Sequence, residues 1–237
     1  MRYREGEVRA ILPAPSSRMM FAAKPKARFE NRAEAGHCLA PLLAARGYTA
    51  PVVYALPRGG VPVAIPIAEA LGAPLDLILV RKLGVPWQPE LGFGAVAEGL
   101  DQPVINQEVV AHAALTEADM APVIARERVE LTRRAALYLK GRARLDPKGR
   151  IAILVDDGLA TGITARAALE ALRKRGAALL VLAVPVAAPD SMAALQDAAD
   201  EVIALETEGF HGGISASYAD FHQLSDAEMM ALLAPPV

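Results

Sequence analysis

The sequence contains little cysteine, no marked excess of either charge and no long apolar run. A single cysteine, Cys38, excludes an intrachain disulfide framework and is typical of a reducing compartment; we expect it to be a small buried residue. The net charge of −2 predicts no general attraction to nucleic acid. The longest apolar run, residues 177–188, contains Pro185 and is too short to span a membrane. No apolar segment follows the first charged residues, so we expect a cytoplasmic protein without a secretory signal.

Two widespread phosphate-binding motifs are also absent. The sequence has no G-x-x-x-x-G-K-[ST] loop and no G-x-G-x-x-G after a predicted strand. The chain of 237 residues is nevertheless 53% hydrophobic, which is enough to bury a sizeable core in one large domain with an appendage.

Residues 151–173 read as a buried strand, an acidic pair, a loop of small residues and a helix. Residues 151–155 are apolar and mostly branched, as in a strand covered on both faces, and Asp156 and Asp157 end this run. The loop at 158–164 contains two glycines and two threonines, and good helix formers follow it.

This layout predicts a site for a phosphorylated sugar. A loop that ends at a helix N-terminus offers backbone N–H groups to an anion, and the hydroxyls of Thr161 and Thr164 add donors. Asp156 and Asp157 would repel a phosphate, so they are better suited to sugar hydroxyls or to a divalent cation. The alternative is an ordinary strand end whose Asp residues begin a turn and a helix.

A second unit of strand, glycine loop and helix covers residues 52–71. Its loop, residues 57–62, contains Arg58, whose forked donors suit phosphate oxygens, and Gly59 and Gly60, which allow unusual backbone angles. This segment is a second candidate anion site; the alternative is a tight turn with a solvated arginine.

Arg81 and Lys82 follow a predicted strand at residues 75–80. At the carboxyl end of a parallel sheet, where ligands bind in open α/β folds, they would reach an anion; the alternative is a solvated basic pair. Residues 84–94 then form a loop with prolines, glycines and Trp87, a composition shared by functional lids and by ordinary long turns.

The alternation of strands and helices predicts an α/β fold with a doubly wound, mainly parallel sheet, helices on both faces and a small hood and hairpin appendage. Strands are expected at residues 52–56, 75–80, 151–155, 178–184 and 201–205, and a hairpin at 95–98 and 103–106. Helices are expected at 28–45, 63–71, 116–141, 165–173, 190–198 and from 226.

Two of these helices carry more specific expectations. Thr116 and Asp119 predict a capping box for the helix at 116–141, with regular structure beginning after Pro122. Its mixed-charge face, Arg126, Glu127, Arg128, Glu130, Arg133 and Arg134, is expected to be solvated. Asp190 or Ser191 is expected to cap the helix at 190–198.

We divide the chain into an irregular N-terminal arm at 1–26, an α/β core at 27–208 and a C-terminal hood segment at 209–237. The hood segment contains glycines, aromatic residues and two histidines, His211 and His222, which we expect to serve surface or packing roles rather than catalysis.

Residues 152–164 resemble the ribose-phosphate signature of the type I phosphoribosyltransferases, which bind 5-phosphoribosyl-1-pyrophosphate (PRPP) with Mg2+. The resemblance implies that Asp156 and Asp157 face the ribose 2- and 3-hydroxyls, and that either can contact the metal through water. It also implies that the 5-phosphate is cradled by Ala160, Thr161, Gly162, Ile163 and Thr164.

Further segments match the family in the same order along the chain. Pro57-Arg58-Gly59-Gly60 resembles its pyrophosphate loop, which implies a cis peptide bond near Arg58-Gly59 and pyrophosphate contacts from Arg58, Gly59 and Gly60. Lys82 and Arg81 would also contact pyrophosphate, residues 84–94 would form a short lid, and the hood segment would select the nitrogen base.

The resemblance implies transfer of a phosphoribosyl group from PRPP–Mg2+ to a nitrogen base by a homodimer, with Asp156, Asp157 and Lys82 as catalytic residues. Ala160 stands where hypoxanthine-guanine enzymes have an Asp that acts as base, which disfavours oxopurine acceptors. Two alternatives use the same cradle: a non-catalytic PRPP-binding regulator, and hydrolysis or phosphorolysis of a related ribose phosphate.

Overall fold

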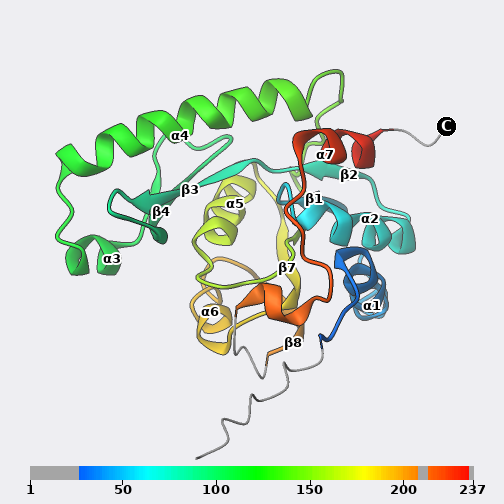
Figure 1. Ribbon diagram of the computed structural model, residues 1–237. Coiled ribbons are helices and arrows are strands. Elements are labelled where there is room, and N and C mark those ends of the chain that lie inside the picture. Colours follow the sequence, from blue (N-terminus) through cyan, green and yellow to red (C-terminus); the bar gives the residue numbers. More distant parts are fainter. Residues whose placement is uncertain (1–26, 208–212, 235–237) are drawn as a thin grey trace, which may run out of the picture.

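The computed structural model of the protein describes residues 27–207 and 213–234 and contains two sheets (Figure 1). The larger sheet has five strands in the order β2-β1-β6-β7-β8, and all its neighbouring strands are parallel. This arrangement confirms the predicted doubly wound α/β fold. The strands are β1 (Val52–Ala55), β2 (Leu75–Leu77), β6 (Ile151–Val155), β7 (Leu179–Val186) and β8 (Glu201–Glu206).

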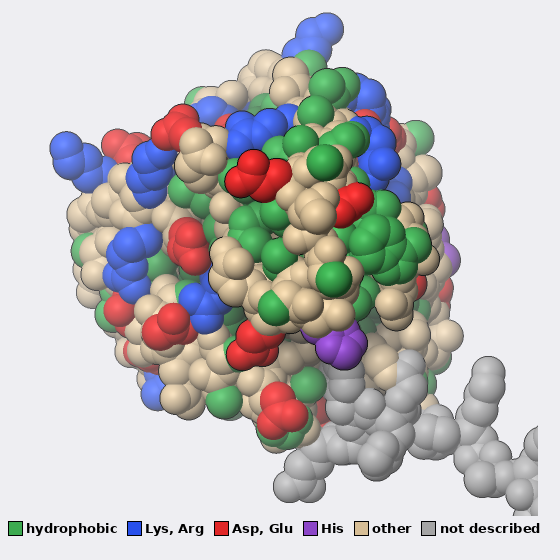
Figure 2. Space-filling model, turned by 90° about the vertical axis from the view of Figure 1, so that its left-hand side faces the viewer, with side chains coloured by type: hydrophobic (Ala, Val, Ile, Leu, Met, Phe, Trp, Pro, Cys, Tyr) green, Lys and Arg blue, Asp and Glu red, His purple; other side chains and the backbone are tan. Residues whose placement is uncertain are grey.

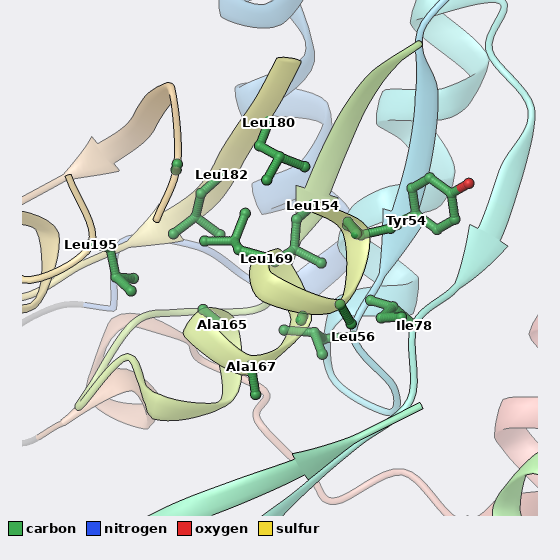
Figure 3. Packing of buried hydrophobic residues seen from close by; sticks show 14 of the residues in the cluster. Tyr54, Leu56, Ile78, Leu154, Ala165, Ala167, Leu169, Leu180, Leu182 and Leu195 are labelled. Atoms are coloured by element: carbon green, nitrogen blue, oxygen red, sulfur yellow. The ribbon is translucent and has the colours of Figure 1, made fainter. Parts of the chain in front are cut away.

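Helices cover both faces of this sheet because successive strand residues point to opposite sides. In β6, Ala152 and Leu154 pack with α5, whereas Ile153 and Val155 pack with α1, α2 and α7. Figure 3 shows the first of these clusters, in which Leu154 of the sheet meets Leu169 of α5. The helices are α1 (Arg32–Ala44), α2 (Gly60–Leu71), α5 (Ile163–Lys174), α6 (Pro189–Ala193) and α7 (Asp226–Leu233); a 3-10 turn, η1, spans Ile214–Ser217.

Residues 80–138 form a separate unit, which we call the side arm. It contains an antiparallel sheet of β3 (Val80–Val85), β4 (Gln88–Ala97) and β5 (Val104–Ile105), with α3 (Gln107–His112) and α4 (Glu117–Tyr138). Figure 1 shows α4 lying across this sheet and reaching towards α7. The side arm buries its own apolar cluster, which consists of Leu83, Val85, Phe93, Val96, Leu115 and Val123.

The side arm corrects two predictions and confirms a third. The strand expected at 75–80 ends at Leu77, so Arg81 and Lys82 lie inside β3 and not after a parallel strand. The loop expected at 84–94 is mostly the hairpin of β3 and β4, because Val85 and Phe93 alternate into the arm's core. The hairpin expected at 95–98 and 103–106 is confirmed as β4 and β5.

Helix α4 also differs in part from expectation. Its capping box of Thr116 and Asp119 is confirmed, but the helix begins at Glu117 and contains Pro122. The preceding short helix α3 was not predicted. Part of the face that was expected to be solvated is turned inward. Glu127 is buried, whereas Arg126 is exposed.

Two expectations at other helices are wrong for local reasons. Cys38 is exposed because α1 turns Ala35, Leu39 and Leu43 towards the sheet, which leaves Cys38 on the outer side. Helix α6 begins with a proline after Ala188, so neither Asp190 nor Ser191 caps it, and it ends earlier than predicted.

The outer face of the side arm exposes apolar side chains. Trp87, at the turn of the β3–β4 hairpin, is 61% exposed, and Val129 of α4 is 73% exposed. Figure 2, viewed from this side, shows apolar side chains gathered near the middle of the face and charged ones around them. In the described ranges, no helix combines the length and apolar character needed to cross a bilayer.

Arg144, which follows the side arm, forms a buried ion pair with the parallel sheet and also contacts the side arm at Glu98. Asp76 of β2 is 1% exposed, and its carboxylate accepts hydrogen bonds from Arg144 Nε (3.1 Å) and the Leu145 backbone (2.9 Å). The Arg144 guanidinium also donates to the Leu77 carbonyl (2.9 Å) and to Glu98 beyond β4.

We expect Arg144→Met to lower the free energy of unfolding by about 3 kcal/mol, because Asp76 is then a buried carboxylate without a cationic partner. Urea denaturation at pH 7 measures the effect. Adding Asp76→Asn to this variant should restore part of the loss. Equal stability of Arg144→Met and the wild type would contradict the assignment.

Candidate functional site

The loops that follow β1 and β6 meet at the carboxyl edge of the parallel sheet. A Cβ built on Gly59 would lie 2.5 Å from Cγ of Asp157 and closer still to its Oδ2, so only glycine fits against this carboxylate. A Cβ on Gly60 would lie 2.5 Å from the Val155 carbonyl oxygen. The peptide bond between Pro57 and Arg58 is cis, one bond earlier than the predicted Arg58-Gly59. The two loops predicted from the sequence therefore form one site.

A cavity of about 560 Å3 opens beside these loops. It brings together four of the predicted residues, Arg58, Gly59, Arg81 and Asp157. The rest of its lining is Arg32, Arg134, Ile214, Phe221, Gln223 and Leu224. The four arginines give the lining many N–H donors, which suit a polyanion, and each arginine is also paired with a carboxylate.

Arg32 connects Asp157 to the C-terminal segment. This residue begins α1, and its Nε lies 2.7 Å from Oδ2 of Asp157. It also donates to the backbone carbonyl of His222 (3.0 Å), and its guanidinium lies 3.8 Å from the ring centre of Phe221. The Tyr218 hydroxyl donates to the Asp157 carbonyl (2.6 Å). Residues from two distant parts of the chain, α1 and the C-terminal segment, thus fix the position of Asp157.

Burial raises the pKa of Asp156 well above its ordinary value, and the nearby charge of Asp157 adds to this rise. Burial also raises the pKa of Asp157, while its hydrogen bond from Arg32 acts in the opposite direction. Burial deprives these carboxyl groups of water as a hydrogen-bond partner, so hydroxyl groups of a ligand would be favourable partners in its place. In the described part of the chain, no group of three or more His, Cys, Asp or Glu residues is arranged to hold a metal ion. A divalent ion at Asp156 and Asp157 would therefore need further oxygen ligands from a substrate and water.

The loop from Ala160 to Thr164 faces a second cavity. Gly162 has a φ of 74°, which glycine adopts readily, and α5 begins at the next residue. Thr161, Gly162 and Ile163 line this second cavity of about 400 Å3, opposite Asn106 and other residues of the side arm. The Ser191 hydroxyl donates to the carbonyl of Ala160 and holds the loop. Neither Ala160 nor Thr164 lines either cavity.

Lys82 lies apart from the first cavity. Its ammonium group donates to the Glu90 carbonyl (2.9 Å), and its methylene groups lie over Gly92. Arg81 points to the other side because neighbouring strand residues alternate, and there it lines the first cavity. His222 is exposed and contacts Asp220 and Glu228, whereas His211 lies outside the described residues.

The sequence model of the phosphoribosyl transferase domain matches residues 31–219. The chain belongs to this family. The resemblance found at residues 152–164 is thereby confirmed, and with it the general class of transferases. Arg32 lies within the matched range, although it was not among the residues predicted for the site.

Similar proteins agree with this assignment. Two Mycobacterium tuberculosis proteins, from strains CDC 1551 and H37Rv, carry provisional names as phosphoribosyl transferases and are 47% identical over 205 residues. The match covers 86% of this chain but 46% of theirs, so the chain spans about half the length of these relatives. The crystal structure of TT1426 from Thermus thermophilus is 41% identical, with a TM-score of 0.73 over 87% of this chain and 97% of that one.

Proposed function

We propose that this phosphoribosyl transferase domain transfers the phosphoribosyl group of PRPP–Mg2+ to a nitrogen acceptor. The bond between ribose C1 and the pyrophosphate oxygen breaks, and its electron pair leaves with the pyrophosphate. A bond forms between C1 and the acceptor nitrogen, which loses its proton to solvent unless it arrives already ionised.

The contact between Gly59 and the Asp157 carboxylate carries this proposal, because it joins a sugar-binding motif to a cationic loop. The ribose hydroxyls would donate to Asp156 and Asp157. Although Oδ2 of Asp157 contacts Arg32, a carboxylate accepts several hydrogen bonds and keeps capacity for a hydroxyl.

The proposal puts the leaving pyrophosphate beside the positive charges of the first cavity. Arg58, Gly59 and Arg81 line the first cavity, whereas the Gly60 N–H donates to the Leu56 carbonyl (2.9 Å). Fixed donors aimed at a departing anion lower the barrier, because they need no rearrangement during the reaction. Magnesium, as part of the substrate, supplies further neutralisation of the pyrophosphate.

The acceptor would enter the same cavity past the apolar residues of the hood segment. Ile214, Phe221 and Leu224 offer a surface for a flat ring, and Gln223 offers an amide that both donates and accepts. Ala160 provides no side-chain base, so we propose a nitrogen heterocycle other than an oxopurine.

We expect PRPP to bind in the presence of Mg2+ and to lose about 100-fold or more in affinity in the Asp156→Asn/Asp157→Asn variant, because hydrogen bonds to charged groups are worth about 1.5–3 kcal/mol each. Titration calorimetry with and without Mg2+ measures this, and a screen of nitrogen heterocycles for released pyrophosphate follows. Binding without turnover by any acceptor would favour the regulator, and free ribose 5-phosphate would indicate hydrolysis. Folded wild-type protein that fails to bind PRPP would contradict every PRPP-based function.

A further inference from the structure

The inward face of α4 carries charged residues where apolar residues are usual. Glu127 is 8% exposed, and the other buried residues of this helix are Val123 and Tyr138. The side chain of Arg134 is 15% exposed and lines the first cavity. A helix face that packs on a core is normally apolar, because an unpaired buried charge is costly. These charges therefore require a reason beyond packing.

Three arginines of the cavity are each held by a carboxylate that does not line it. Arg81 donates through Nε (2.9 Å) and Nη2 (2.7 Å) to Oε2 of Glu127. Arg134 donates through Nε (2.7 Å) to Oε1 of Glu130. Asp226, the first residue of α7, lies 3.6 Å from Arg58.

Two of these pairs, Arg134–Glu130 and Arg58–Asp226, belong to one connected network, whereas Glu127 pairs with Arg81 and Arg126 beside it. Arg133 donates to Glu130 (2.7 Å) and also to Asp226 (3.2 Å), so it links α4 to α7. Hydrogen bonds from Arg133 and Arg134 lower the pKa of Glu130 to about 2, which keeps it ionised at neutral pH. The carboxylates hold the guanidinium groups in place from outside the cavity lining. Each guanidinium has five N–H donors, and its carboxylate partner accepts from only some of them.

We propose that Arg134 of α4 binds the pyrophosphate group of PRPP, and that Glu130 and Glu127 are positioning residues that hold Arg134 and Arg81 towards it. This inference rests on the proposed function. The separation of the two cavities supports pyrophosphate over the 5-phosphate, because the loop at Thr161 and Gly162 faces the second cavity and Arg134 the first. Arginine suits this role because its forked donors match phosphate oxygens.

The test compares three ligands, each with Mg2+, by titration calorimetry: PRPP, pyrophosphate, and ribose 5-phosphate, which lacks the pyrophosphate. Arg134→Gln should weaken PRPP and pyrophosphate about 10-fold to 100-fold and leave ribose 5-phosphate unchanged. Arg128→Gln is the matched control, because Arg128 lies on the same helix but donates to the Asp101 carbonyl outside the cavity. It should bind all three ligands like the wild type.

The positioning residues are tested by the difference between two substitutions. Glu127→Ala should weaken pyrophosphate about 10-fold, whereas Glu127→Gln, which keeps an acceptor oxygen for Arg81, should lose much less. A purely structural role would lower thermal stability and weaken ribose 5-phosphate as much as pyrophosphate.

The outcomes separate this inference from the proposed function. Wild type that binds PRPP, together with Arg134→Gln that binds it equally well, would overturn the role of Arg134 alone. Equal weakening of pyrophosphate and ribose 5-phosphate would do the same. Wild type that binds no PRPP would overturn both proposals.

Discussion

Gly59→Ala should bind PRPP about 100-fold more weakly than the wild type and still fold. The backbone of Gly59 has φ −62° and ψ −35°, which alanine adopts without strain. The added Cβ, however, would overlap the carboxylate of Asp157, which Arg32 holds at 2.7 Å. Asp157 must then move away from the proposed sugar position, and the charge-assisted hydrogen bonds that we propose it makes to the ligand would be lost. Calorimetric titration gives the affinity, and thermal unfolding shows that the fold is retained.

A double-mutant cycle tests the cause of this loss. If the overlap with the carboxylate is responsible, Gly59→Ala should cost little further affinity in protein that already carries Asp157→Ala. If the losses in PRPP affinity caused by Gly59→Ala and Asp157→Ala are additive, the effect of Gly59→Ala comes from the loop backbone and not from the carboxylate. Unchanged affinity of the single Gly59→Ala variant would contradict the close contact itself.

Asp156→Asn should have opposite effects on binding and on stability. It removes a carboxylate that we propose holds a ribose hydroxyl, so PRPP affinity should fall about 100-fold. It should also raise the free energy of unfolding at neutral pH, because burial raises the pKa of this carboxyl in the folded protein. At neutral pH the unfolded chain ionises this carboxyl freely whereas the folded site disfavours its charge, and asparagine removes that difference.

The sign of the pH dependence follows from the direction of this shift. The folded pKa is above the unfolded value near 3.8, so the folded state binds the proton more tightly. The stability contributed by Asp156 is present below the unfolded pKa and is lost as the pH rises through the folded pKa. The stabilising effect of Asp156→Asn should therefore vanish towards pH 3 and grow above it.

Urea denaturation of the wild type and Asp156→Asn between pH 3 and pH 8 measures this difference. Asp101→Asn is a suitable control, because a hydrogen bond from Lys174 lowers the pKa of this exposed carboxyl. Its removal should not stabilise the protein at neutral pH. An Asp156→Asn variant less stable than the wild type at pH 7 would contradict the raised pKa.

Local patterns in the sequence were sufficient for the parallel sheet and for both loops of the site. The apolar run at Ile151–Val155 and the acidic pair after it specify a strand end directly, and Gly59 and Gly60 mark the second loop. Their placement at one edge followed from the rule that parallel strands end on the same side.

The sequence was less informative where distant residues meet. Arg32 contacts Asp157 across 125 positions, and no periodicity reports such a contact. Arg134 belongs to a helix whose mixed charges are equally typical of a solvated surface. Lys82 was expected directly after a parallel strand, but that strand ends at Leu77 and Lys82 lies within the hairpin strand β3, whose neighbouring residue Arg81 lines the first cavity.

The side arm has its own apolar cluster, and this has a consequence for the energetics of ligand binding. A unit with its own cluster can open locally at a lower free energy than global unfolding, although opening of this arm would also expose Ala95, Ala97 and Tyr138, which pack in the clusters of the parallel sheet. Opening of the arm would carry away Arg81 and Arg134 while Arg58 and Asp157 stay on the intact sheet. The measured affinity for a ligand that spans both units is then the intrinsic affinity reduced by the fraction of molecules with the arm closed. Substitutions deep in the arm's core would thus weaken binding without touching the ligand.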